Sequence, residues 1–126
     1  MAARSRPSRA WTFFFWAAAI FNFAVGAAGM FAPTPDVDAR LVGVLVFGFG
    51  IAYAMIARDP ERYAGVLWAG VFSKIGVVAL LIASADGSGG GLMSTILALD
   101  LIFAFGFLVY LLTRVERGTP EGANQP

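Results

Sequence analysis

Four long apolar stretches, each bounded by a short polar segment, constrain this chain more than any other feature. They are residues 11–31, 41–57, 63–83 and 92–113. A helix rises 1.5 Å per residue, so about 20 apolar residues cross the roughly 30 Å hydrocarbon core of a membrane. The stretches lack the polar–apolar alternation of membrane β-strands, and a helix satisfies its own backbone hydrogen bonds in lipid. The sequence therefore predicts an all-α integral membrane four-helix bundle.

Composition agrees with burial in lipid rather than in a water-soluble core. Hydrophobic residues make up 59% of the 126 residues and charged residues only 13%, and a short soluble chain cannot bury that much apolar surface. The sequence contains no histidine and no cysteine, which removes the usual metal ligands and the usual neutral-pH acid–base group. We therefore predict no catalytic residue and no metal site. The net charge of +1 argues against a nucleic-acid partner.

The basic residues predict the orientation of the four stretches. Seven of the nine lysines and arginines lie before the first stretch, between the second and third, or after the fourth. Of the other two, Arg40 lies between the first and second stretches and Lys74 lies inside the third. The positive-inside rule then places both termini and the RDPER loop, residues 58–62, in the cytoplasm. We expect the protein to lie in the inner membrane of a bacterial cell.

The ends of the chain are predicted to lie outside the lipid. Residues 1–10 form a basic cytoplasmic N-terminus, and residues 114–126 are expected to be a disordered cytoplasmic tail. The start of the chain imitates a secretory signal, but its apolar part is longer than the roughly 7–15 residues of a signal core. The first stretch is therefore expected to be an uncleaved membrane helix.

Small residues recur at helical spacing in three of the stretches. Helices in lipid approach one another closely through glycine, alanine and serine, so these stripes predict the packing faces. The stripes are Ala18, Asn22 and Gly26 in the first stretch, Gly50, Ala54 and Ala57 in the second, and Gly65, Ala69, Ser73 and Gly76 in the third.

Lys74, Asp100 and Asn22 are the polar residues that the apolar stretches place deepest. Helical rise puts all three about 12–14 Å below the outer edge of the hydrocarbon core. A lone charge at the membrane centre costs at least about 2.5–3.5 kcal/mol. We therefore expect Lys74 and Asp100 to form an ion pair and to share hydrogen bonds with Asn22. This group either fixes the register of the helices or forms a polar ligand site.

Arg58 and Arg62 flank the Asp59-Pro60 turn of the RDPER loop. Arginines at the end of a membrane helix can contact anionic lipid head groups or the acidic loop of a partner. The simpler interpretation is a solvated loop that only fixes topology.

Three short motifs resemble those of the small four-helix membrane proteins called DoxX-like. They are ARDPERY at 57–63, GVFSKIG at 70–76 and LALDLIF at 97–103. The resemblance covers about residues 10–113 and implies a four-helix membrane fold. Some members of that group are accessory subunits of membrane redox systems. No cofactor-binding residue is carried over to this sequence, so the cofactor, if there is one, stays unidentified.

Together these features favour a function other than catalysis. The leading hypothesis is a subunit or accessory protein of a larger membrane complex, or a homo-oligomer, with membrane lipids as its surroundings. One alternative is a small transporter or channel that uses a polar site at Lys74 and Asp100. A second alternative is a lipid- or quinone-modifying membrane enzyme, in which the same two residues would supply the reactive groups.

Overall fold

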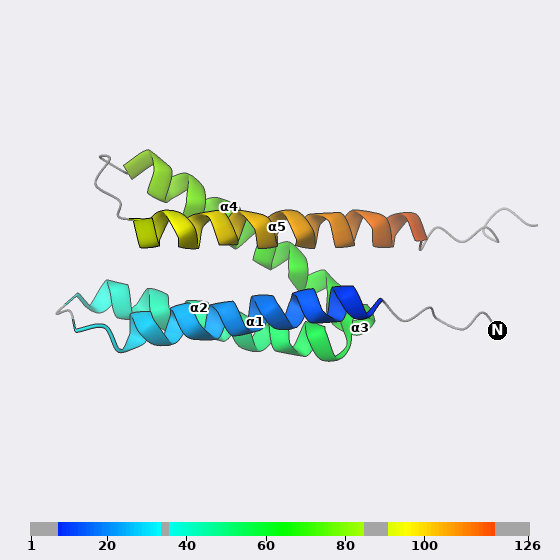
Figure 1. Ribbon diagram of the computed structural model, residues 1–126, viewed down its shortest axis with the longest axis horizontal. Coiled ribbons are helices and arrows are strands. Elements are labelled where there is room, and N and C mark those ends of the chain that lie inside the picture. The colour runs from blue at the N-terminus through cyan, green and yellow to red at the C-terminus, as the bar shows by residue number, and fades with distance from the viewer. Residues whose placement is uncertain (1–7, 34–35, 85–90, 118–126) are drawn as a thin grey trace, which may run out of the picture. The chain divides into compact units, whose positions relative to one another are not determined.

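The computed structural model describes residues 8–33, 36–84 and 91–117, and its secondary structure there is helical (Figure 1). The elements are α1 (Arg9–Met30), α2 (Val37–Arg58), α3 (Pro60–Tyr63), the 3₁₀ turn η1 (Ala64–Val66), α4 (Leu67–Ser84) and α5 (Gly91–Arg117). Four segments are long and apolar enough to cross a membrane: Arg9–Met30, Val37–Arg58, Pro60–Ile82 and Ser94–Arg114. The predicted all-α class with four long apolar helices is confirmed.

Polar residues extend two of the helices beyond the predicted apolar stretches. The second helix begins at Val37 rather than at 41, because the Asp36 side chain accepts a hydrogen bond from the Asp38 backbone N–H at 3.0 Å and caps the helix. The fifth element continues to Arg117, so the predicted tail boundary at 113/114 falls inside a helix. Arg114 is favourably placed there because a cation near a helix C-terminus complements the helix dipole.

The remaining parts of the two predicted terminal segments, residues 1–7 and 118–126, lie outside the described residues. Disorder of residues 118–126 therefore remains a prediction. The cytoplasmic location of the basic segment before Ser8 also remains a prediction.

The third predicted span does not start as one continuous helix. Pro60 occupies the first helical position of α3, and the Asp59 carboxylate accepts a hydrogen bond from the Arg62 N–H at 3.3 Å. Both features favour a helix start. After one turn the backbone tightens into the 3₁₀ turn, and α4 begins at Leu67. Apolar composition continues across this break, so hydropathy alone gives no sign of it.

The chain divides between Val66 and Leu67 into two compact units. The first unit holds α1, α2, α3 and η1, and α1 packs along α2. The second unit holds α4 and α5, and α4 runs diagonally across α5 (Figure 1).

Glycines let the backbones of α1 and α2 approach very closely. A Cβ atom added to Gly26 would lie 2.5 Å from the backbone nitrogen of Phe47, and one added to Gly43 would lie 2.5 Å from that of Met30. Real Cβ atoms do not come so near to backbone, so any side chain at these positions would force the helices apart. This is the small-residue packing that helices use in lipid.

Two further glycines continue the same contact, and together the four positions form the glycine seam: Gly26, Gly29, Gly43 and Gly50. A Cβ on Gly29 would lie 3.0 Å from the Gly43 Cα, and one on Gly50 would lie 2.8 Å from the ring of Phe23. Later positions in α1 thus meet earlier positions in α2, so the two helices form an antiparallel hairpin.

The predicted packing stripe of the first stretch agrees with the structure, and that of the third stretch does not. Ala18, Asn22 and Gly26 are all buried on α1. In the third stretch, by contrast, Cβ atoms on Gly65 and Gly76 would meet nothing within 4 Å, so that stripe is not a packing face there. The buried residues of α4 are instead Leu67, Gly70, Val71, Lys74 and Val78.

Candidate functional site

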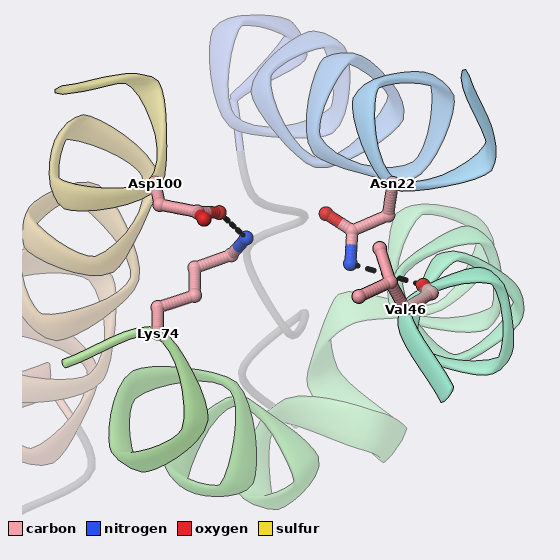
Figure 2. Close-up of polar contacts among 4 residues, drawn as sticks. All are labelled: Asn22, Val46, Lys74 and Asp100. Carbon is pink, nitrogen blue, oxygen red and sulfur yellow. Dashed lines mark hydrogen bonds and ion pairs between the residues drawn. The ribbon is translucent and has the colours of Figure 1, made fainter. Parts of the chain in front are cut away.

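The structure brings Lys74 and Asp100 together inside the second unit. Lys74 Nζ donates a hydrogen bond to Asp100 Oδ1 at 2.5 Å, and the two side chains form an ion pair. Figure 2 shows the lysine reaching from α4 and the aspartate from α5, with their charged ends facing each other. Only 6% of the lysine side chain and 15% of the aspartate side chain are exposed. The buried ammonium group and the partly buried carboxylate are therefore each other's counter-charge.

An aromatic ring completes the surroundings of the lysine. Phe103 follows Asp100 by three residues, which places both on one face of α5. Its ring centre lies 5.8 Å from Lys74 Nζ, within reach of a cation–π interaction. The ring also stacks on Phe107, with centroids 6.4 Å apart. The helical spacing from Asp100 could have pointed to Phe103 in the sequence.

Asn22 has a hydrogen-bond partner within its own unit. Its Nδ2 donates a hydrogen bond to the backbone oxygen of Val46 at 3.2 Å, joining α1 to α2 beside the glycine seam (Figure 2). The asparagine side chain is buried. Asn22 belongs to the first unit, whereas Lys74 and Asp100 belong to the second, so the predicted hydrogen bonds between them stay a prediction. A backbone carbonyl carries no signal in the sequence, which is why Val46 could not be foreseen.

Arg58 and Arg62 lie on either side of the turn between α2 and α3. Both side chains are exposed, and the Arg62 guanidinium lies 5.3 Å from the ring centre of Tyr63. The Asp59 carboxylate between them is engaged with the backbone N–H of Arg62. The two arginines therefore stand at the surface of the first unit, where the apolar part of α2 ends.

The chemistry that this arrangement offers is ionic rather than nucleophilic. Lys74 Nζ is held by the Asp100 carboxylate, and while the lysine carries its proton in that ion pair it has no lone pair with which to attack a substrate. Among the described residues, no three side chains of His, Cys, Asp or Glu are grouped as a metal site would require. The pair places two opposite charges between two apolar helices. These charges can hold the two helices in one register or bind a charged ligand.

Comparison with known proteins gives no relative from which a function could be transferred. No family model matches the chain, and no curated protein or solved structure matches it. The DoxX-like resemblance therefore stays a proposal that rests on three short motifs.

Proposed function

We propose that the chain is a four-span protein of a bacterial inner membrane that works as an assembly subunit. In this proposal the four long helices form a bundle with both termini in the cytoplasm. The bundle associates laterally with other membrane subunits or with copies of itself. The DoxX-like resemblance supports the same proposal, since accessory subunits occur in that group.

The observation that carries the proposal is the wide exposure of large apolar side chains on every long helix. Phe13 is 77% exposed on α1, Phe72 80% on α4 and Phe105 70% on α5, and Leu45 is exposed in the same way on α2. Water does not cover apolar surface of this extent in a stable protein. Lipid tails and apolar faces of other membrane helices do cover such surface.

The polar contacts inside the helices support a structural role. Lys74 bonds to Asp100 within one helix pair, and Asn22 bonds to the Val46 carbonyl within the other. Each contact joins two neighbouring helices of one unit. Buried ion pairs and cross-helix hydrogen bonds of this kind can specify how helices meet without adding much net stability.

Mass measurement of the purified protein tests the assembly role. One chain has a mass of 13.3 kDa. Native mass spectrometry from a mild detergent or a nanodisc is expected to show a larger protein mass, either a multiple of this value or the sum with a fixed partner. A uniform 13.3 kDa species that stays integral to membranes would contradict the assembly role and leave the membrane location intact.

A transporter or channel is the second candidate, and the uneven exposure of the ion pair favours it. Asp100 is more exposed than Lys74, so its carboxylate is the more accessible of the two groups to a cationic solute. Flux across liposomes that contain the purified protein tests this candidate. Transport requires that flux is present in the wild type and lost in Asp100→Asn. If the double variant Lys74→Met/Asp100→Leu folds and keeps all activity, the pair is not a ligand site.

A further inference from the structure

Three exposed arginines among the described residues lie at one end of the helical hairpin in the first unit. The first helix begins at Arg9, the second ends at Arg58, and α3 with Arg62 follows directly. Because α1 and α2 run antiparallel, the start of α1 and the turn after α2 lie at the same end of this unit (Figure 1). We call Arg9, Arg58 and Arg62 the arginine end.

The opposite end of the same hairpin has the opposite charge balance. Its described charged residues are Asp36, Asp38 and Arg40, and all three are exposed. The hairpin is therefore electrically asymmetric along its axis. A membrane leaflet with an anionic surface attracts the arginine end and not the other.

The Arg62 side chain is exposed at the turn between α2 and α3. The carboxylates at this end are Asp59 and Glu61, and the Asp59 carboxylate accepts the Arg62 backbone N–H at 3.3 Å. The Arg62 guanidinium lies 5.3 Å from the centre of the Tyr63 ring. A guanidinium beside a ring face still donates through its edge, and its paired N–H groups match the oxygens of a phosphate.

An aromatic and apolar border adjoins these charges. Trp11 lies two residues after Arg9, with its ring centre 5.8 Å from that of Phe14 and 6.0 Å from that of Phe15. Tryptophan and tyrosine concentrate at the depth of the lipid head groups. Phe13 beside them is exposed. Along α1, the cationic side chain and the exposed apolar surface thus lie within one or two helical turns of each other.

This combination matches one kind of molecule better than a soluble anion or an acidic protein loop. A phospholipid carries a phosphate at the membrane surface and acyl chains directly beneath it. A soluble anion would use only the arginines, and an acidic loop would leave the apolar border without a partner.

We propose that Arg58 and Arg62, together with Arg9, bind the phosphate of an anionic phospholipid whose acyl chains lie along the adjoining apolar surface of α1 and α2. This inference rests on the membrane insertion proposed above, and it does not depend on the assembly role.

Lipid binding to the purified full chain tests the inference. The protein in mild detergent is titrated with phosphatidylglycerol and, separately, with zwitterionic phosphatidylcholine, and bound lipid is counted by native mass spectrometry. The wild type is expected to prefer phosphatidylglycerol. In Arg58→Gln/Arg62→Gln, the dissociation constant for phosphatidylglycerol should rise about thirty-fold, because each basic residue near an anionic surface contributes about a factor of five.

Two further variants keep the test decisive if the double variant folds poorly. Arg40→Gln removes one charge from the opposite end of the hairpin, roughly 30 Å away along α2, and should change the affinity by less than about twofold. Arg58→Lys/Arg62→Lys keeps both charges but loses the planar N–H pairs. It should bind phosphatidylglycerol more weakly than the wild type and more tightly than the glutamine variant.

The possible outcomes separate the inference from the proposed function. If alkaline carbonate extracts the wild type from membranes, membrane insertion is wrong and the lipid site falls with it. If the wild type stays integral but binds both lipids equally, the lipid site alone is wrong. Displacement of the lipid by equal concentrations of glycerol phosphate would assign the arginines to a soluble anion. Unchanged lipid binding with loss of a copurifying protein in the double variant would assign them to a protein partner.

Discussion

Lys74 shows how a charged residue can be accommodated within an otherwise apolar helix. Its ammonium group meets the Asp100 carboxylate on one side and lies within reach of the Phe103 ring. The aspartate gains a counter-charge by the same contact. Since either residue alone would leave a buried charge uncompensated, the two residues are a unit for stability.

Replacing one partner is therefore expected to be worse than replacing both. Lys74→Met should lower the free energy of unfolding by about 3 kcal/mol, because the partly buried Asp100 carboxylate is left without its counter-charge. The double variant Lys74→Met/Asp100→Leu should lose less than the sum of the two single variants. Denaturation in bicelles, followed by tryptophan fluorescence, measures these differences. Additive effects of the two substitutions would show that the ion pair does not couple the helices.

Asn22 provides a smaller test in the first unit. Asn22→Leu removes the hydrogen bond to the Val46 carbonyl and should lower the free energy of unfolding by about 0.6 kcal/mol, the average for cross-helix hydrogen bonds in membranes, and by no more than about 1.7 kcal/mol. The same denaturation assay measures it. A loss as large as that of Lys74→Met would mean that Asn22 does more than join α1 to α2.

Among the helices, α1 and α2 have the closest backbone contact because glycines line it on both sides. The glycine seam leaves no room for a single methyl group at its tightest points. Helix α2 also contains a glycine with open space around it, since a Cβ on Gly48 would meet nothing within 4 Å. The contrast between the two kinds can be measured.

Gly43→Ala is expected to destabilise the hairpin, whereas Gly48→Ala is not. The new methyl group at Gly43 would lie 2.5 Å from the backbone nitrogen of Met30, and backbone cannot move aside as a flexible side chain can. Overpacking of this kind costs about 1–3 kcal/mol or more. Gly48→Ala should be neutral or slightly stabilising, because alanine favours the helical conformation. Equal effects of both substitutions would show that the helices are further apart than described.

The sequence predicted the elements well and their contacts only in part. Apolar length identifies the four long helices, because spanning a hydrocarbon core requires that length. The sequence placed Lys74 and Asp100 at similar depth along their helices, and the structure brings their charged groups together. The break at Ala64–Val66 gave no signal, since the turn and the helix that follows it form one continuous apolar sequence. The choice of packing glycines also could not be settled, because Gly43 and Gly65 look alike until the neighbouring backbone is known.

In the whole chain, each of the two units that meet at Val66/Leu67 has its own kind of helix–helix contact. Backbone contact through glycines joins α1 and α2, and a pair of opposite charges joins α4 and α5. The division falls inside the third apolar segment, Pro60–Ile82. Membrane orientation must therefore be tested by a method that reports on single positions in both units.

Cysteine labelling provides such a method, because the sequence contains no cysteine. Asp38→Cys at the start of α2 is expected to react with a membrane-impermeant maleimide in spheroplasts. Glu61→Cys in α3 and Arg114→Cys near the end of α5 should react only after the membrane is permeabilised, because positive loops stay in the cytoplasm. Reaction of all three from outside would overturn the proposed orientation.

The contrast between the glycine seam and the ion pair also has a thermal consequence. Glycine has no rotamers, so bringing α1 against α2 immobilises no side chain at the seam positions. Holding Lys74 against Asp100 freezes a long side chain and costs about 1.5–2 kcal/mol of conformational entropy. That cost grows with temperature, so α4 and α5 should separate before α1 and α2 when the protein is heated. Hydrogen–deuterium exchange at increasing temperature would then detect faster exchange in α5 while the backbone amides of α2 remain protected.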